Sequence, residues 1–359
     1  MNNLKNLGFD NWFSDKVDLS KTDFSIVRVI SVNKNSFVVS NGEKDIYAEL
    51  TGKFLFNTDS AVDLPTVGDF VYAQLFDDDT LAIIQDILPR KSLLKRKAAG
   101  KKIDFQLIAA NIDIAIIMQA LDSNFNIRRL ERYLVIINDN NITPLILLSK
   151  SDLISPEEAE EKKKQILETL PDAKIFSFSN NNASDIENIK SLFTPHKTYC
   201  LLGSSGVGKT TLLNNLIHQN LYKTQPIREK DDRGKHTTTR RELIILENGA
   251  IIIDNPGMRE LGIISNESGI SSTFGEIDEL SDQCKYKDCT HTVEAGCAVL
   301  EALEHGEISE ERYENFLKLY KESKYNEMSY VEKRQKDKKF GKFFNSAMKK
   351  IKNRKDSYK

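Results

Sequence analysis

Residues 197–211 read KTYCLLGSSGVGKTT, and no other stretch of the sequence says as much about the architecture. An apolar run ends in the pattern G-x-x-x-x-G-K-[ST] and passes directly into TTLLNNLIHQN, which is typical of a helix. In this setting the glycines let backbone N–H groups wrap phosphates, Lys209 reaches the β- and γ-phosphates, and Thr210 offers its hydroxyl to Mg²⁺. The predicted phosphate-binding residues are Gly203, Ser204, Ser205, Gly206, Val207, Gly208, Lys209, Thr210 and Thr211.

The segments before this loop alternate between apolar runs and amphipathic stretches. The runs IDIAIIMQAL, TPLILLSK and AKIFSFS are separated by NIRRLERYLVIIND and SPEEAEEKKKQILETL. Strands buried on both faces that alternate with helices indicate βαβ units and a parallel sheet. The second helix carries its own start signal, with Ser155 as N-cap, Pro156 as the first helical residue and Glu158 as the partner in a capping box.

A second phosphate-site element is expected in the apolar run IIIDNPG, residues 251–257. Asp254 can hold Mg²⁺ through water, and Gly257 can offer a backbone N–H to the γ-phosphate. The preceding run RELIILE is joined to this one by Asn248-Gly249, which is the strongest short hairpin signal. The two strands are therefore predicted to be antiparallel neighbours.

The polar segment between these elements contains GKHTTTRRE, residues 234–242. Such a segment can order over the γ-phosphate and return a threonine hydroxyl to Mg²⁺. We favour Thr239 for this role, with Thr238 as second choice. Three consecutive threonines from Thr237 cannot be distinguished by sequence, and a solvated loop is the alternative.

A further motif, LLSKSDL at residues 147–153, precedes the phosphate loop. It is similar to the Asn-Lys-x-Asp element with which GTPases read guanine. Asp152 can accept the guanine N1–H and N2–H, Lys150 can pack its stem over the ring, and Ser149 and Ser151 complete the motif, although a Lys and an Asp after a strand can also mark a plain turn. Because a parallel sheet brings its strand ends to one edge, a circular permutant can carry this motif first without altering the site.

Residues 24–90 hold five short alternating segments separated by turn sequences such as NGEK and PTVGD. This spacing predicts a small β-barrel, which we assign to an OB-fold, with an SH3-like barrel as the alternative. The basic stretch 91–104 has no strong periodicity and predicts a linker that passes over the surface.

Three of the four cysteines lie beside a histidine near the C-terminus. Cys284, Cys289, His291 and Cys297 make a Cys₃His set without spare ligands, which is typical of a closed, tetrahedral, structural zinc site, one per chain. Free thiols beside a chance histidine are the alternative. Cys200 sits in an apolar run and is expected to be a buried thiol.

Composition and charge bound the kind of protein. The 359 residues are 40% hydrophobic, enough for two or three domains with full cores. A membrane span needs about 18 uncharged apolar residues, which no stretch approaches, and no signal peptide is evident, so we expect a cytoplasmic protein without a membrane partner.

The net charge of −2 conceals a basic tail at 333–359 that interleaves lysines with Phe340, Phe343 and Phe344. This composition favours RNA; a solvated basic end and a membrane-surface helix are the alternatives.

The order SKSD, GSSGVGKTT, GKHTTTRRE, DNPGMRE and C-x4-C-x-H-x5-C, behind an N-terminal barrel, resembles the circularly permuted ribosome small subunit-dependent GTPase A family. The resemblance covers nearly the whole chain. It implies an OB-fold, a permuted G domain and a zinc module. It also implies a GTPase that binds GTP or GDP and the 30S ribosomal subunit with its 16S rRNA, late in the maturation of that subunit.

Three departures from the usual motifs bear on the site. Ser149 stands where the guanine motif usually has Asn, which removes a side-chain amide that ties the base to the phosphate loop. IFSFSNNN at 175–182 differs from Ser-Ala-Lys, so the N–H that meets the guanine carbonyl near 177–180 is left open. Met258 stands where many GTPases orient the attacking water with Gln. His236 is the alternative catalytic candidate, and it can equally contact only RNA or solvent.

The expected division is an N-terminal extension 1–23, an OB-fold barrel 24–90, a basic linker 91–104, a circularly permuted α/β P-loop GTPase domain 105–262, a mostly helical zinc-binding module 263–332 and a basic tail 333–359. The expected function is GTP hydrolysis, slow in isolation and stimulated by the small subunit. The alternative is a nucleotide-gated RNA-binding switch in which turnover is incidental. An ATP-dependent small-molecule kinase would share the phosphate loop but would not explain Asp152. Nothing in the pattern demands more than a monomer.

Overall fold

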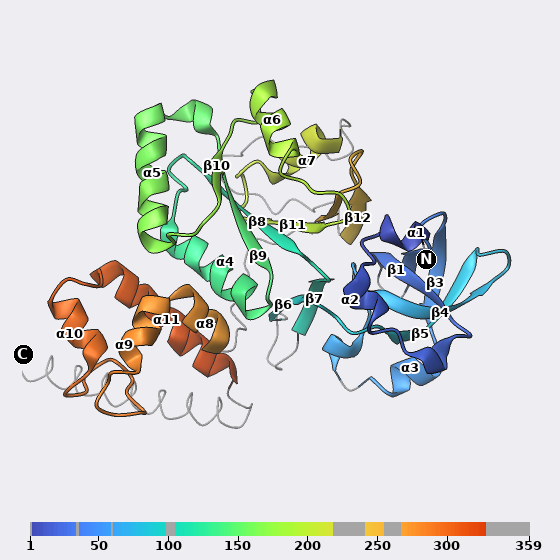
Figure 1. Cartoon of the computed structure of the whole chain (residues 1–359), viewed down its shortest axis with the longest axis horizontal. Helices are drawn as coiled ribbons and strands as arrows, with labels where there is room; N and C mark the ends of the chain where they lie inside the picture. The colour runs from blue at the N-terminus through green and yellow to red at the C-terminus, as the bar shows by residue number, and fades with distance from the viewer. Residues whose placement is uncertain are drawn as a thin grey trace, which may run out of the picture.

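The computed structural model describes residues 2–33, 36–58, 60–97, 105–217, 241–254 and 267–327. An N-terminal barrel and a C-terminal group of helices lie on opposite sides of a central α/β domain (Figure 1). None of the described helices has the length and apolar character needed to cross a membrane.

The strands, in chain order, are β1 Ser25–Val32, β2 Phe37–Ser40, β3 Asp45–Leu50, β4 Phe70–Phe76, β5 Leu81–Ile87, β6 Leu93–Lys97, β7 Phe105–Ala110, β8 Ile114–Ala120, β9 Thr143–Ser149, β10 Ile175–Ser177, β11 Thr198–Gly203, β12 Arg241–Ile245 and β13 Ile251–Asp254. The α-helices are α1 Asn2–Lys5, α2 Asn11–Ser14, α3 Gly52–Phe56, α4 Ile127–Asp139, α5 Pro156–Thr169, α6 Ala183–Lys190, α7 Lys209–Ile217, α8 Glu267–Thr273, α9 Gly275–Ser281, α10 Ala298–Glu304 and α11 Glu310–Glu327. Short 3-10 helices span Leu19–Lys21, Ala61–Asp63 and Ser151–Leu153.

The N-terminal barrel has the strand order β1-β2-β3-β5-β4 and closes where β4 pairs with β1. β3 and β5 are parallel, whereas the other pairs are antiparallel. This five-stranded Greek-key barrel, with helix α3 between β3 and β4, is an OB-fold. The parallel pair excludes the all-antiparallel SH3-like alternative. All five predicted strands are confirmed, and their inward residues, among them Val27, Val39 and Ile84, form the barrel core.

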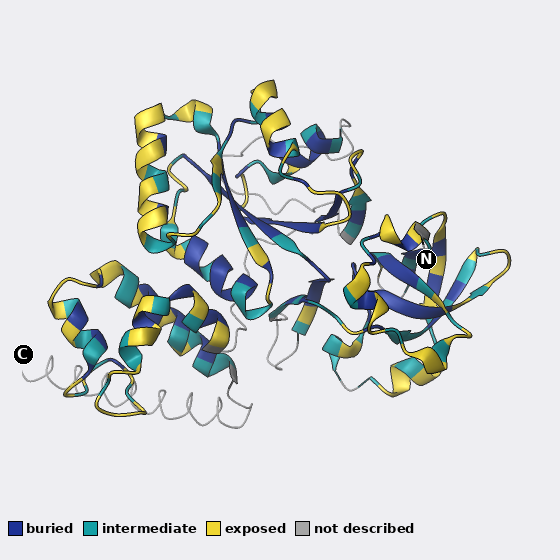
Figure 2. Ribbon diagram, in the orientation of Figure 1, coloured by how far each residue is buried: buried dark blue, intermediate teal, exposed yellow. Residues whose placement is uncertain are grey.

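The central sheet runs in the order β10-β9-β8-β11-β13, all parallel, with β12 antiparallel at the end. Alternate residues of one strand face different cores: Leu147 packs with α6 and α7, and Leu148 packs with α4, α5 and α8. The strands are therefore buried on both faces, whereas α5 exposes its outer side (Figure 2). This explains the uninterrupted apolar runs in the sequence.

Two local predictions are confirmed by side-chain geometry. Ser155 accepts a hydrogen bond from the backbone of Glu158, whose carboxylate accepts one from the backbone of Ser155, so α5 begins with a capping box. The Asn248-Gly249 turn joins β12 and β13, and Gly249 has a φ of 82°.

The expectation of an irregular linker at 91–104 is wrong for its first half. β6 pairs with β7 in a two-stranded antiparallel sheet of its own. Leu94 is buried in the core of the α/β domain, while Lys95 and Arg96 are half-buried. The basic residues in this strand hid its alternation from sequence analysis.

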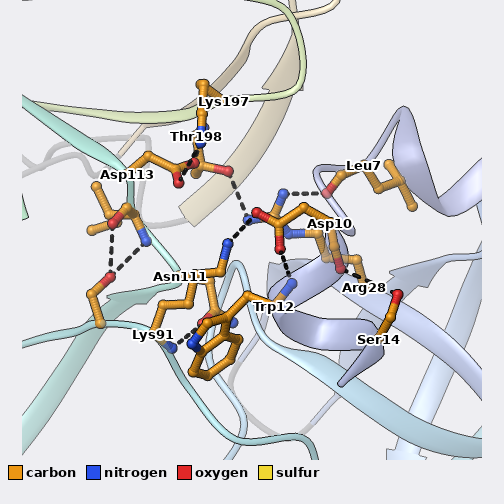
Figure 3. A network of polar contacts seen from close by, with 12 residues as sticks. Leu7, Asp10, Trp12, Ser14, Arg28, Lys91, Asn111, Asp113, Lys197 and Thr198 are labelled. Atoms are coloured by element: carbon orange, nitrogen blue, oxygen red, sulfur yellow. Dashed lines mark hydrogen bonds and ion pairs between the residues drawn. The ribbon is translucent and has the colours of Figure 1, made fainter. Parts of the chain in front are cut away.

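The barrel and the central sheet are joined in two ways. β1 continues the sheet by pairing with β12, through Ser31 opposite Glu242 and Val32 opposite Arg241. Beside this pairing lies Arg28, only 1% exposed, whose guanidinium points from the barrel toward the α/β domain (Figure 3).

Arg28 uses its donors on three separate segments. Nε donates to the Gly68 carbonyl at 3.1 Å, Nη1 to the Leu7 carbonyl, and Nη2 to Thr198 Oγ1 at 3.0 Å. The backbone N–H of Thr198 in turn donates to Asp113 Oδ2 at 2.8 Å. Burial lowers the pKa of the Arg28 guanidinium to about 10, so it is still charged at neutral pH.

A second buried ionic group fixes the C-terminal helices to α4. Glu131 on α4 is 2% exposed and forms an ion pair with Arg312 of α11, and it also accepts from Asn315. Arg312 also donates to the Thr273 carbonyl at 2.8 Å and reaches Glu276 at 2.6 Å. α8 and α11 are thereby held against the α/β domain.

We expect Arg28→Met to lower the free energy of unfolding by about 3 kcal/mol, because the apolar side chain leaves several buried acceptors without a donor. The midpoint of thermal unfolding, measured by scanning calorimetry, should fall by roughly 5 °C or more.

Arg128→Met is the matched control, because Arg128 forms its ion pair with Glu314 on the surface at 3.1 Å. Such a pair contributes about 1 kcal/mol or less. Equal midpoints for the two variants would contradict the role given to Arg28.

Candidate nucleotide site and metal site

The parallel strands bring the sequence motifs to one edge of the sheet. β9 ends at Ser149, β11 at Gly203 and β13 at Asp254, and these strands run in the same direction. The carboxyl ends of parallel strands are where open α/β sheets bind ligands. The motif that comes first in the chain thus lies beside the loop that comes later.

The phosphate loop connects β11 to α7. A Cβ at Gly203 would lie 2.6 Å from the Met118 carbonyl oxygen, and Gly203 has a φ of 151°, so only glycine fits there. Lys209 Nζ donates to the carbonyls of Gly203 and Ser204, both at 2.8 Å, so the lysine folds back over its own loop. Ser205 and Thr210 are exposed.

Ser204 places a buried polar atom in the phosphate loop. Its Oγ is buried and has no hydrogen-bond partner among the described residues. Asp254, opposite Glu242 in the β12–β13 pair, is the last residue of β13, which pairs in parallel with β11, and it is partly exposed.

The motif predicted to read guanine forms a tight turn after β9. Lys150 has a φ of 61°, and its Nζ forms an ion pair with Asp122 Oδ2 at 2.8 Å. Asp152 is exposed and accepts from Asn181 Nδ2 at 3.4 Å. The pKa of the Asp152 carboxyl is lowered, chiefly by a hydrogen bond from the Ser179 side chain. Asp152 is therefore ionised and open to a ligand, which its predicted role as an acceptor of two N–H groups requires.

Ser149 lacks the amide of the usual asparagine, but its hydroxyl still bonds to the phosphate loop. The Ser149 hydroxyl is buried and donates to the Val207 carbonyl at 2.7 Å, a shorter contact than its 3.3 Å approach to the Gln119 carbonyl. A hydroxyl thus makes the bond to the loop that the missing amide would make. The bond could not be predicted from the sequence, because Ser149 and Val207 are 58 positions apart in the chain.

The loop after β10 completes this side of the site. Ser179 donates its backbone N–H to Asp185 Oδ2 at 2.7 Å, and Asn180 Nδ2 donates to the Gly208 carbonyl at 3.3 Å. Residues 179–181 therefore face both the guanine motif and the phosphate loop. The sequence motifs pointed to residues 177–180 but did not single out Asn180, because no motif assigns an asparagine to that position.

Several predicted site residues lie outside the described residues. These are His236, Thr237, Thr238, Thr239 and Gly257, together with Met258 and the basic tail.

The predicted Cys₃His set comes together in space. The ligand atoms of Cys284, Cys289, His291 and Cys297 all lie within 4.8 Å of one another. Cys284 Sγ is 3.8 Å from Cys297 Sγ, and the two sulfurs lie 3.6 and 3.5 Å from His291 Nδ1. A tetrahedral metal with bonds of about 2.3 Å to sulfur and 2.0–2.1 Å to nitrogen needs edges of about 3.8 and 3.6 Å. The cluster fits such an ion.

A hydrogen bond fixes which nitrogen of His291 faces the cluster. Ser281 Oγ donates to the Ile277 carbonyl at 2.7 Å and lies 3.2 Å from His291 Nε2. The hydroxyl has one proton, so it accepts from Nε2–H, which leaves the Nδ1 lone pair directed at the thiols. Cys200, by contrast, is buried in β11 among the residues of the sheet core.

Comparison with known proteins agrees with this arrangement. A family model described as RsgA GTPase matches residues 87–264. The small ribosomal subunit biogenesis GTPase RsgA 2 of Vibrio parahaemolyticus is 36% identical over 358 residues, which cover 99% of this chain and 96% of that protein. The protein of the same name from Listeria monocytogenes is 39% identical over 323 residues, 90% of each chain.

Solved structures give the same result. The crystal structure of YjeQ from Thermotoga maritima has a TM-score of 0.62 and 27% identity, covering 83% of this chain and 98% of that one. YloQ, described as a circularly permuted GTPase, has a TM-score of 0.60 and 25% identity, covering 88% of this chain and 100% of that one. This chain, with its permuted motifs gathered at one sheet edge, belongs to the RsgA GTPase family.

Proposed function

We propose that this protein hydrolyses GTP and binds the 30S ribosomal subunit, assisting its late maturation, with hydrolysis stimulated by the subunit. The observation that carries the proposal is the hydrogen bond of Ser149 to Val207. It ties a motif suited to guanine directly to a loop suited to phosphates, so one nucleotide can span both. The relatives named for small-subunit biogenesis support the choice of partner.

The roles at the phosphates follow from residue chemistry. Lys209 would stabilise charge on the β- and γ-phosphates, and Thr210 would place its hydroxyl on Mg²⁺. Asp254 would hold Mg²⁺ through water, and Thr239, with Thr238 as second choice, would complete its ligands. An Mg²⁺ ion held by these residues would neutralise charge on the phosphates during hydrolysis.

The attacking water needs a positioning group. Met258 has a thioether, which orients a water poorly. We therefore propose that His236 orients the attacking water, because an imidazole can act as a base near neutral pH. We expect slow hydrolysis by the isolated protein and faster hydrolysis when the small subunit helps to position the attacking water.

The Cys₃His cluster would hold one structural Zn²⁺ per chain. Three thiolates and an imidazole are a borderline-soft donor set without an open position, which suits zinc and gives it no role in catalysis. The ion would stabilise the connection between α9 and α10.

The RNA partner would be 16S rRNA in the subunit. An OB-fold and a basic, aromatic tail are both suited to structured or single-stranded RNA. We further propose that the protein acts in the cytoplasm as a monomer.

Asp152→Asn tests the base reader. The Asn amide would face the guanine N2–H₂ with a donor, so GTP affinity should fall by about 100-fold, and preference for GTP over ATP should be lost. Binding of fluorescent GTP and ATP analogues measures both, with Asp172→Asn, on an exposed turn, as the matched control. A retained GTP preference would contradict the placement of the guanine site.

GTP turnover tests the proposed partner. Purified protein should hydrolyse GTP slowly, and added 30S subunits should raise the rate by about tenfold or more, because they would help to position the attacking water. The control is an equal concentration of 50S subunits, which should have no effect. GTP-dependent binding to 30S without stimulation would instead identify a nucleotide-gated RNA-binding switch and remove His236 from catalysis.

Metal analysis tests the cluster. Inductively coupled plasma mass spectrometry of the purified protein should find one zinc ion per chain. Cys289→Ala should lose the zinc and lower the midpoint of thermal unfolding, because a structural zinc contributes to folding. Cys200→Ala removes a thiol outside the cluster and should keep the metal. Zinc-free wild-type protein with an unchanged fold would refute the assignment.

A further inference from the structure

Asn180 lies at the junction of the guanine motif, the phosphate loop and α7. Its Nδ2 donates to the Gly208 carbonyl at 3.3 Å, and its backbone carbonyl accepts from Asn215 Nδ2 at 3.1 Å. The two bonds tie one residue to the end of the phosphate loop and to the helix that follows it. Because neither bond involves a ligand, the protein alone sets the position of Asn180.

The amide of Asn180 also contacts the loop closely. A Cβ added at Gly208, whose φ is 91°, would lie 2.6 Å from Asn180 Nδ2. The Asn180 side chain therefore packs directly against the backbone that precedes Lys209. A larger residue at Gly208 would push the two apart.

Ser149 and Asn180 donate hydrogen bonds to consecutive carbonyl groups of the phosphate loop. Ser149 donates to the Val207 carbonyl at 2.7 Å, and Asn180 donates to the next carbonyl, that of Gly208. A serine side chain is short and carries one donor, whereas an amide carries two. The usual asparagine of the guanine motif is absent at 149, and an asparagine from the neighbouring loop supplies an amide donor here.

The other half of the amide has no partner among the described residues. Asn180 Oδ1 is buried and accepts no hydrogen bond there. A buried polar atom left unpaired is rare and needs an explanation, and a site that takes a ligand is one of the usual ones. Asn180 is thus a polar side chain in the nucleotide site whose hydrogen bonding the described residues satisfy only in part.

We propose that Asn180 is a positioning residue for guanine nucleotide binding, replacing the amide that Ser149 lacks by holding the base-reading loop against the phosphate loop. This inference rests on the proposed function, because it requires the site to bind a guanine nucleotide. Asn180 acts through the position of Gly208 and of the 179–181 loop, so it governs how long the nucleotide stays bound.

The rate of GDP release tests this role. Release of a fluorescent GDP analogue, chased with excess GDP, should be about tenfold faster from Asn180→Ala, because one hydrogen bond to the loop is lost. Asn180→Asp keeps the size of the side chain but turns an oxygen toward the Gly208 carbonyl. Release of GDP from this variant should be at least as fast as from Asn180→Ala. Asn188→Ala, on the exposed side of α6, is the matched control and should release GDP at the wild-type rate.

A reciprocal exchange separates positioning from simple packing. Ser149→Asn combined with Asn180→Ala moves the amide to the usual place in the motif, and release should return to within about threefold of wild type. Ser149→Asn alone places two amides at adjacent carbonyls of a packed loop and should release GDP faster than wild type. A purely structural role would not be rescued by moving the amide.

The outcomes distinguish failure of the role given to Asn180 from failure of the proposed function. Wild-type release rates in Asn180→Ala and Asn180→Asp would overturn the inference, and so would a double variant as fast as Asn180→Ala. Wild-type protein that binds no guanine nucleotide would overturn the proposed function itself, before any variant is compared.

Discussion

The buried guanidinium of Arg28 is the interaction on which the relation between barrel and nucleotide sheet depends. A charged group taken out of water costs several kcal/mol unless its donors are satisfied. Here they reach Leu7, Gly68 and Thr198, which belong to the N-terminal extension, the barrel and β11. Nearby Asp113 and Asp69 favour the charged form. None of these segments can shift alone without leaving the cation unsatisfied, so together they define one orientation of the barrel.

Contacts between distant segments also explain how a permuted chain keeps its nucleotide site. The strand that leads to the guanine motif and the strand that leads to the phosphate loop are parallel and separated only by β8. What the site requires is that their ends meet, and the bond from Ser149 to Val207 shows that they do. Connectivity between the strands is therefore free to vary, whereas the order of strands across the sheet is not.

Local pattern predicted most of the architecture. Alternation gave the barrel strands, the phosphate loop fixed the strand and helix around it, and Ser155 with Glu158 marked the start of α5. Cysteine spacing likewise identified four groups that meet within 4.8 Å. What sequence could not give were contacts between distant residues. Arg28 lies in the run FSIVRVI, and an arginine there is normally expected to face solvent. The groups that accept its hydrogen bonds come from other parts of the chain, so the sequence does not indicate its burial. The contact between Asn180 and Gly208 could not be predicted either, because only the folded chain brings these two residues together.

The pairing of β1 with β12 also has a consequence for biosynthesis. Ser31 and Glu242 are about 200 positions apart in the chain. At a translation rate of about 5–20 residues per second, Ser31 would leave the ribosome roughly 10–40 s before its partner strand exists. During that interval the end of β1 is an unpaired strand edge, and β11 has not yet supplied the hydroxyl that Arg28 requires. The barrel can close early, but its final attachment awaits the second half of the nascent chain.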